Sequence, residues 1–239
     1  MEQILKELFE KYNISYDDTK IAKLIKFYDM VIETNKVMNL TNITDEKEFA
    51  IKNVLDCVLP MKIIPINASV LDIGAGAGFP SIPLKIMRPD LDIVMVDSLN
   101  KRINFLKTVI QKLDLKNISA NHMRIEDYAI THKEKYDIVV ARAVARLNTL
   151  LEYSLPLVRI KGKVIAYKSQ KADEEIAEAQ NALNVLGGKV TELQTVLIKE
   201  IDSIRVNIVV EKFKSTPKEY PRGKNLPKLK PIIWKLVFC

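Results

Sequence analysis

Apolar residues recur with a helical period through the first 58 residues of the chain. Leu5, Leu8 and Phe9 show the three-to-four-residue spacing that places side chains on one face of a helix. The period resumes after residues 16–19, which are suited to capping a second helix, and a third helix is predicted from about Glu46 to Leu59. We expect a helical N-terminal extension that packs on the main domain. The same helices could also shape a substrate entrance.

From Ser69 onward, short apolar runs alternate with amphipathic helical stretches. This alternation predicts an α/β fold with a parallel sheet covered on both faces. The last two runs alternate apolar and polar residues, which indicates an antiparallel pair at one edge. Helices are predicted over 100–113, 148–158 and 172–186. The predicted strands are 70–73, 93–96, 117–120, 136–141, 163–168, 190–198 and 204–210.

One turn after the first predicted strand holds three of the seven glycines in the chain. Because glycine loses more entropy on folding than other residues, such a cluster indicates a backbone that turns tightly or approaches a ligand closely. A helix is predicted to start at Ser81, where Pro80 and Pro83 are tolerated in the first turn. Its free N–H groups and positive end would face the ligand. The three glycines are Gly74, Gly76 and Gly78.

The turn does not match the common phosphate-binding loops. Phe79 stands where the dinucleotide fingerprint requires glycine, and no Gly-Lys-Ser/Thr follows. The pattern Asp-x-Gly-x-Gly-x-Gly, starting at Asp72, instead resembles the first motif of S-adenosylmethionine-dependent methyltransferases. Asp97 ends the next apolar run, where an acid can bind two ribose hydroxyls. The alternative is a structural glycine turn and a helix-capping aspartate. We predict a ligand site at Asp72, Gly74, Gly76, Gly78 and Asp97.

Two later segments could complete this site. The segment after the third strand is placed to wall an adenine, with Ile125 as the apolar contact and Glu126 or Asp127 as the polar one. Arg142 follows the fourth strand, at the sheet edge where ligands bind. An arginine so close to a buried strand usually has a definite partner. That partner is predicted to be a ligand or, alternatively, Asp137 or another nearby acid.

Composition narrows the class of protein. The chain has 239 residues, of which 48% are hydrophobic, and only two cysteines and two histidines. These numbers allow one sizeable core and argue against a disulfide framework, a zinc site or a histidine-based triad. No apolar run approaches the length of a membrane span, and the N-terminus lacks signal-peptide character. We therefore expect a cytoplasmic protein with no metal and no membrane association. We also expect a monomer.

The net charge of +7 is concentrated near the C-terminus. From Lys212 to Lys235 there are eight basic residues against Glu219, whereas the rest of the chain is neutral. A localised basic segment suits a polyanion such as nucleic acid, and Tyr220 beside it could stack on a base. The alternative is a solvated tail kept soluble by lysine.

Several segments together resemble one family, the bacterial small-subunit ribosomal RNA guanine-N7 methyltransferases of the glucose-inhibited-division-B type. Residues 97–102 and 141–147 are the most specific, whereas the glycine turn identifies only the wider superfamily. Thr34, Ser169 and Asn225 depart from the family pattern, the first two at the rim of the substrate site. The resemblance rests on 38–41, 72–84, 88–89, 96–102, 141–147 and 220–222.

The resemblance implies a doubly wound, mostly parallel seven-stranded Rossmann-like sheet with an antiparallel edge and a helical N-terminal extension. It implies domains at 1–60, 61–212 and 213–239, the last a basic proline-containing tail. The implied cofactor is S-adenosylmethionine, and the implied partner is ribosomal RNA or the small ribosomal subunit. The candidate catalytic residue is Arg142, which could hold cofactor or substrate. The residues implied to line the cofactor are Gly74, Phe79, Ile125, Glu126 and Arg142, beside Asp72 and Asp97.

Three other functions stay open from the sequence. The chain could be a methyltransferase for a protein or a small molecule, or a non-catalytic nucleic-acid-binding protein on the same fold. A nicotinamide-dependent dehydrogenase is disfavoured by Phe79 and by the absence of an evident acid or base for hydride transfer. Methylation of guanine N7 fits the scarcity of histidine, because that nitrogen has a lone pair and no proton to remove.

Overall fold

A computed structural model describes residues 1–233. Its seven strands follow the hydrogen-bonded order β3-β2-β1-β4-β5-β7-β6. The pairs β1–β4, β2–β3 and β4–β5 are parallel, and β7 pairs antiparallel with both β5 and β6. The predicted mostly parallel sheet with an antiparallel edge is confirmed. The strands are β1 Ser69–Ile73, β2 Asp92–Asp97, β3 Ile118–His122, β4 Tyr136–Arg142, β5 Val158–Lys168, β6 Gly188–Ile198 and β7 Ser203–Lys212.

The chain divides into two compact units, which are described separately below. The first unit consists of residues 1–68 and 75–122, and the second of residues 69–74 and 123 onward. The predicted domain boundaries at 60 and 212 stay a proposal, and residues 234–239 of the predicted tail lie outside the described part of the chain. The helices of the first unit are α1 Glu2–Lys11, α2 Asp18–Met38, α3 Glu46–Phe49, α4 Asp56–Val58, α5 Ser81–Met87 and α6 Asn100–Lys112.

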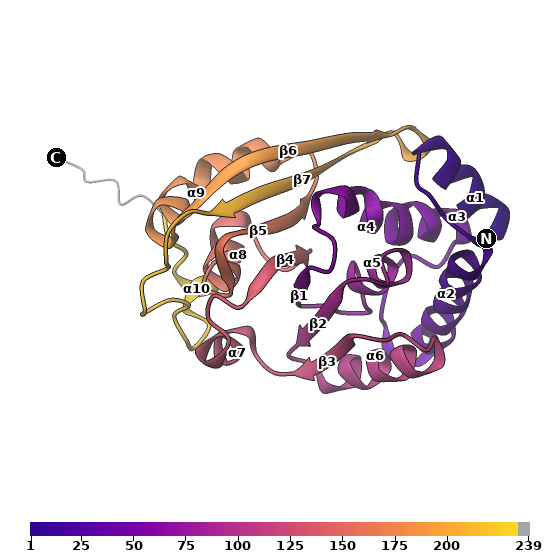
Figure 1. Cartoon of the computed structure of the whole chain (residues 1–239), viewed down its shortest axis with the longest axis horizontal. Helices are drawn as coiled ribbons and strands as arrows, with labels where there is room; N and C mark the ends of the chain where they lie inside the picture. Colours follow the sequence, from indigo (N-terminus) through magenta and orange to yellow (C-terminus); the bar gives the residue numbers. More distant parts are fainter. Residues whose placement is uncertain (234–239) are drawn as a thin grey trace. The chain divides into compact units, whose positions relative to one another are not determined.

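In the first unit the predicted N-terminal helices are present. Asp17 caps α2 by accepting a hydrogen bond from the backbone N–H of Lys20 at 2.8 Å. The third predicted helix is continuous but irregular, since a π-helical stretch over Ala50–Leu55 separates α3 from α4. A 3₁₀ turn over Leu59–Ile63 follows α4. In this unit α2 packs on α5, while α6 runs alongside β2 and β3 (Figure 1).

Arg88 anchors the chain after α5. Its guanidinium donates to the carbonyl oxygens of Met61, Ile64 and Pro65 and to both carboxylate oxygens of Asp90. The hydrogen bonds from the Arg88 guanidinium to the Asp90 carboxylate hold the pKa of Asp90 down at about 2. The Arg88-Pro89 motif therefore has a structural explanation, namely the attachment of residues 61–65 to the end of α5.

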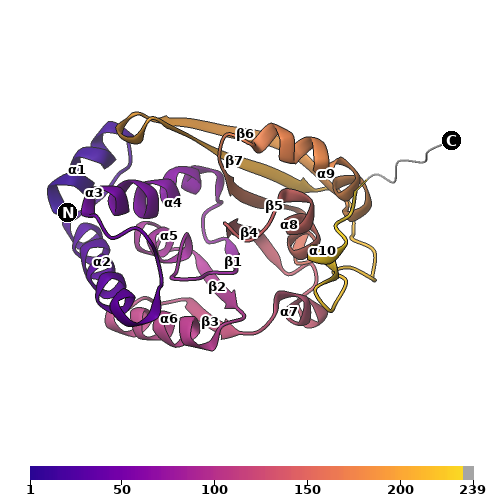
Figure 2. The same cartoon turned by 180° about the vertical axis from the view of Figure 1, so that it is seen from behind.

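In the second unit, α8 and α9 pack on each other, and α8 also contacts β5, as Figures 1 and 2 both show. β6 and β7 form a long hairpin in the same unit (Figure 2). The strand order reverses between β1 and β4, both in this unit. Ligands of such sheets bind at the carboxyl ends of the strands at this reversal. The helices of this unit are α7 Ile125–Thr131, α8 Leu147–Ser154, α9 Ala172–Leu186 and α10 Leu226–Leu229.

Helix α6 begins at Asn100, as predicted. Its N-cap residue is Leu99, whose N–H donates to the Asp97 carboxylate at 2.9 Å. One predicted helix end is wrong, since we expected a helix to Val158, whereas α8 ends at Ser154. Pro156 explains the early end, because proline lacks the N–H that would continue the helix.

Candidate functional site

In the first unit, the glycine turn is tied to the carboxyl end of β2. The N–H of Gly76 donates to Oδ2 of Asp97 at 2.9 Å, and the N–H of Ala75 donates to the carbonyl oxygen of Val96 at 3.3 Å. Gly76 and Gly78 have φ angles of 58° and 99°, in the region that favours glycine. The predicted glycine turn and the predicted acid therefore lie in direct contact.

Asp97 is 4% exposed and already has donors in the protein. Besides Gly76 and Leu99, the guanidinium of Arg102 lies 3.4 Å from Oδ2. A carboxylate offers about four lone-pair positions, so these contacts leave acceptor capacity for a ligand hydroxyl. Asp97 thus braces the turn, and it can serve as the predicted ribose acceptor only in addition to that role.

The Phe79 side chain belongs to an aromatic cluster. Its ring centroid lies 5.4 Å from that of Phe27 and 5.6 Å from that of Phe49, and the residue is 8% exposed. The cluster connects the glycine turn to α2 and α3 within the first unit. Phe79 was predicted to line the cofactor, and the packing of its ring leaves chiefly its backbone and the exposed edge for that contact.

In the second unit, Gly74 follows β1 and lies against the loop after β4. A Cβ atom at Gly74 would be 2.9 Å from Cγ2 of Val144, so a larger residue would require the Val144 side chain to move. Gly74 has a φ of 70°, and Ala143 in the loop has a φ of 58°. Asp72 is completely buried in β1. The two strand ends at the reversal of strand order are therefore closely packed.

Acidic residues of α9 hold the loop that begins at Arg142. Arg146 donates to both carboxylate oxygens of Glu178 at 2.8 Å and to Glu174 at 3.1 Å. Lys168 donates to the carbonyl oxygen of Ala145 at 2.8 Å and to Glu175 at 2.6 Å. Sequence reasoning missed this arrangement, although the acids in the first turns of the predicted helix 172–186 were visible. The result is a fixed backbone directly after Arg142.

Arg142 is half-buried at the carboxyl end of β4, opposite Tyr167 of β5. The alternative prediction that Asp137 is its partner is wrong. Asp137 lies five residues earlier on the same strand, roughly 16 Å away at the rise of a β-strand. Its carboxylate instead accepts hydrogen bonds from Ser69 and Arg159.

Ile125 and Glu126, predicted in the loop after the third strand, are instead the first two residues of helix α7. Ile125 is half-buried, and Glu126 is buried with its carboxylate accepting from Arg124 at 2.9 Å. Burial, reinforced by the negative charge of Glu126, raises the pKa of Tyr153 to about 12. Glu126 therefore keeps a charge partner of its own chain and lies close enough to Tyr153 to affect its ionisation.

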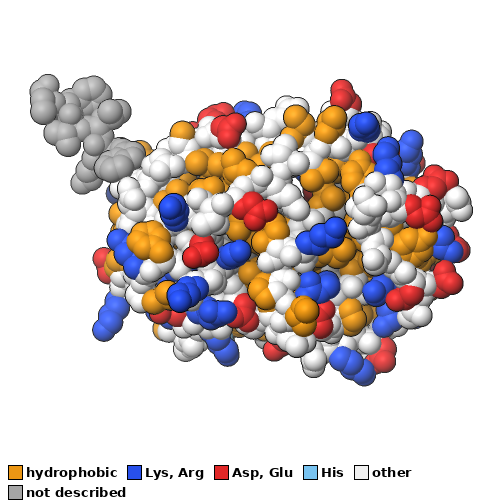
Figure 3. Space-filling model, turned by 45° about the horizontal axis from the view of Figure 1, so that its top comes forward, with side chains coloured by type: hydrophobic (Ala, Val, Ile, Leu, Met, Phe, Trp, Pro, Cys, Tyr) orange, Lys and Arg blue, Asp and Glu red, His pale blue; other side chains and the backbone are white. Residues whose placement is uncertain are grey.

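Part of the basic tail segment is neutralised inside the protein. Arg222 donates from its backbone N–H and its guanidinium to the fully buried Glu152, at 2.6–2.9 Å. Lys212 is also fully buried and contacts Glu134 at 3.0 Å, and burial lowers its pKa. On the face in Figure 3, acidic and basic side chains are interspersed. The exposed bases of the described tail are Lys214, Lys218, Lys224, Lys228 and Lys230.

Residues 1–233 contain no cluster of three or more His, Cys, Asp or Glu side chains that could hold a metal ion. Within the same range, no helix is long and apolar enough to cross a membrane. His122 contacts the carbonyl oxygen of Ser98 at 3.0 Å, and the ring of His132 stacks on Tyr128 at 3.9 Å. Both histidines thus have partners within their own units.

Comparisons with known proteins support one family. The family model described as "GidB: rRNA small subunit methyltransferase G" matches residues 20–204. A "Ribosomal RNA small subunit methyltransferase G" from Desulforamulus reducens is 44% identical over 232 residues, which cover 95% of this chain and 97% of the relative.

Two solved structures share the fold at low sequence identity. TYW2 of P. horikoshii in complex with MeSAdo has a TM-score of 0.56 at 18% identity, over 68% of this chain and 63% of that one. A SAM-dependent methyltransferase from Aquifex aeolicus has a TM-score of 0.52 at 18% identity, over 69% and 93%. At this identity, the likeness supports the fold alone.

Proposed function

We propose, from the premise that the chain belongs to the GidB family of rRNA small subunit methyltransferases, that it methylates N7 of a guanine in 16S ribosomal RNA. The observation that carries this proposal is the match of the family over residues 20–204, with relatives aligned along nearly the whole chain. The sequence resemblance to this family is thereby confirmed. The guanine, its N7 position and the ribosomal substrate are the proposed refinements.

The residues of the glycine turn fit S-adenosylmethionine. Gly76 and Gly78 have positive φ angles that residues with side chains rarely adopt, and Asp97 retains acceptor capacity beside them. In the second unit, we assign Asp72, Gly74, Ile125, Glu126 and Arg142 to the same cofactor. When bound, S-adenosylmethionine supplies an electrophilic methyl group.

The proposed chemistry needs positioning more than proton transfer. Guanine N7 carries a lone pair and no proton, so no general base is required. Arg142 stays protonated and cannot act as a base, but it can bind a carboxylate or a phosphate through its fork of N–H donors. Its loop is fixed by Glu174, Glu175 and Glu178, which suits catalysis by orientation. The target base would have to leave its stack to reach the site.

The test uses purified protein, radiolabelled S-adenosylmethionine and small ribosomal subunits from cells that lack this methylation. Nuclease digestion then locates the label, and we expect it in N7-methylguanine of 16S RNA. A reaction without protein and one with fully methylated subunits are the controls. Label on protein, or on another position of the base, would contradict the proposal.

The same experiment separates the alternatives. RNA binding and cofactor binding without transferred label would favour the non-catalytic protein on this fold. Repeating the assay with naked 16S RNA tells whether the assembled subunit is required. A cytoplasmic monomer remains our proposal for the working form of the protein, and sedimentation in the presence of cofactor tests the monomer.

A further inference from the structure

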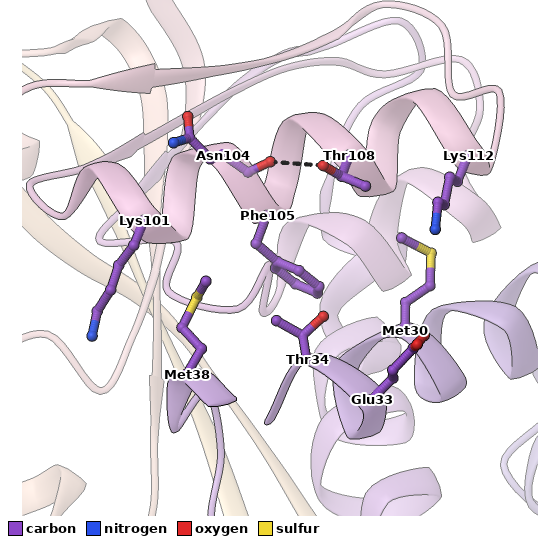
Figure 4. Close-up of a pocket in the computed structure, with 9 residues that line it drawn as sticks. All are labelled: Met30, Glu33, Thr34, Met38, Lys101, Asn104, Phe105, Thr108 and Lys112. Carbon is purple, nitrogen blue, oxygen red and sulfur yellow. Dashed lines mark hydrogen bonds between the residues drawn. The ribbon is translucent and has the colours of Figure 1, made fainter. Parts of the chain in front are cut away.

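A groove of about 360 Å³ lies between α2 and α6 in the first unit, outside the predicted cofactor site. Figure 4 shows Met30 and Met38 reaching from α2 toward α6, with Phe105 entering between them from α6. The volume is near the lower end of the roughly 300–1,000 Å³ typical of ligand pockets. The remaining lining residues are Glu33, Thr34, Lys101, Asn104, Thr108 and Lys112.

The floor of the groove is apolar and its rim is polar. Phe105 is 5% exposed and Met30 is 9% exposed, whereas Lys101, Thr108 and Lys112 are exposed. Small Thr34 faces the ring of Phe105 in Figure 4, and it leaves the space that a larger side chain would fill. An apolar floor with an aromatic ring suits a flat, apolar-faced ligand such as a nucleobase.

The charge along this groove is basic. Helix α6 contains Lys101, Arg102, Lys107 and Lys112 and no acidic residue. Lys26 of α2 donates to the carbonyl oxygen of Lys112 at 2.8 Å, which adds another cation at that end of the groove. Among the lining residues, Glu33 is the single acid. Since Lys101 and Lys112 are about 16 Å apart along the helix, positive charge brackets the groove at both ends.

We propose that this groove binds an unpaired nucleotide of the RNA substrate, with the base on Met30, Phe105 and Met38 and the flanking phosphates on Lys101 and Lys112. This inference rests on the proposed function. Lys101 follows Asp97 by four residues, so within the first unit the groove begins beside this residue of the proposed cofactor site. The bound nucleotide would therefore be a neighbour of the target guanine, held while the guanine reacts.

A partner protein fits the groove less well. A docked amphipathic helix needs a continuous apolar strip for side chains three, four and seven residues apart. Here the apolar floor consists of three side chains between two lysines. Phosphates are the natural partners of exposed lysines, and bases are the natural partners of an aromatic floor.

The test uses two variants of the groove and one control. Thr108→Trp fills the groove, and Lys112→Glu reverses the charge at one of its ends. The control is Lys107→Glu. Lys107 is an exposed lysine of the same helix, but its side chain points about 120–140° away from Lys101 and Lys112. We measure binding of a fluorescent eight-nucleotide single-stranded RNA by anisotropy. We also measure KM and kcat on undermethylated subunits and the cofactor Kd by calorimetry.

We expect Thr108→Trp and Lys112→Glu to raise the RNA Kd and the KM about tenfold, as for the loss of one stacked base or phosphate contact. The kcat and the cofactor Kd should stay within about twofold of the wild type, since neither residue is assigned to the cofactor. Lys107→Glu should stay within about twofold in every measurement. Binding of the same sequence as a blunt duplex should be insensitive to Thr108→Trp. If circular dichroism shows that Thr108→Trp does not fold, the results for Lys112→Glu alone test the inference.

Equal effects of Lys112→Glu and Lys107→Glu would overturn the inference, because they would reflect only the net charge of α6. Unchanged RNA binding in all variants would overturn it too and leave a partner protein as the occupant. Both outcomes leave the proposed function intact if the wild type labels N7-methylguanine. Absence of label in the wild type would instead refute the proposed function, and the anisotropy measurements would still decide the groove.

Discussion

Asp97 shows how one residue can serve both the fold and a ligand. Its buried carboxylate accepts hydrogen bonds from the N–H groups of Gly76 and Leu99, which join the glycine turn, β2 and α6. Hydrogen bonds to a charged group each contribute about 1.5–3 kcal/mol. The sequence pattern predicted a ribose acceptor, with a helix-capping aspartate beside a structural glycine turn as the alternative. Its position at the end of β2 places the carboxylate among backbone donors, so it also stabilises the turn that the cofactor would need.

We predict that Asp97→Ala weakens cofactor binding about tenfold or more, which corresponds to about 1.4 kcal/mol. The reason is the combined loss of the ribose acceptor and of the brace on Gly76. RNA binding should stay within about twofold. Calorimetry with S-adenosylmethionine and anisotropy with labelled RNA measure the two affinities. Asp92→Ala, at the exposed start of the same strand, is the matched control. An equal loss of both affinities in a folded protein would remove Asp97 from the cofactor site.

At the scale of elements, the glycine turn connects strand β1 to the short helix α5, and side chains pack closely around Gly78 in this turn. Gly78 has a φ of 99°, and a Cβ atom there would lie 2.6 Å from Cγ1 of Ile82 and 3.0 Å from Cδ2 of Leu106. Clustered glycines in the sequence already indicated a tight turn. The clash with Ile82 is local to the start of α5, whereas the contact with Leu106 of α6 arises only when the helices pack.

We predict that Gly78→Ala lowers the free energy of unfolding by about 2 kcal/mol or more, from backbone strain and overpacking together. Gly223→Ala is the control, since a Cβ atom at Gly223 would meet no atom within 4 Å. That variant should stay within about 0.5 kcal/mol of the wild type. Urea unfolding followed by circular dichroism measures both. A neutral Gly78→Ala variant would show that α5 and α6 can shift to accept the methyl group.

At the scale of the whole molecule, charge pairs between distant segments decide where the tail runs. Arg222 and Glu152 are 70 residues apart in the sequence, and Glu152 is completely buried in α8. Arg222 also donates to the carbonyl oxygen of Lys230, so one guanidinium holds two parts of the tail. The tail is thus anchored by one of the bases that made the segment a candidate for binding a polyanion.

We predict that Arg222→Ala destabilises the protein by about 3–5 kcal/mol, because it leaves the Glu152 charge buried and uncompensated. The double variant Arg222→Ala with Glu152→Gln should recover part of this loss, since the unpaired charge is gone. Lys224→Ala, an exposed neighbour, serves as the control and should be nearly neutral. Thermal unfolding gives the stabilities, and limited proteolysis reports release of the tail. If Arg222→Ala matched Lys224→Ala, the pair would not anchor the tail.

The sequence by itself determined the order and type of nearly all elements, the glycine turn and the family. These depend on periodicity, on backbone preferences of glycine and proline, and on short motifs, all of which are local along the chain. Pro156 was also a local signal, and its neglect caused the error at the end of α8.

Only the tertiary structure decided which charged and aromatic side chains are committed to the fold. Phe79 packs on Phe27 and Phe49, and Lys212 and Arg222 are paired within the protein. The groove between α2 and α6 likewise depends on helices about 70 residues apart in the sequence. Burial and pairing depend on distances between remote segments, which local patterns of hydrophobicity and charge do not contain. Motifs therefore identified the chemistry, and packing determined which residues remain available to perform it.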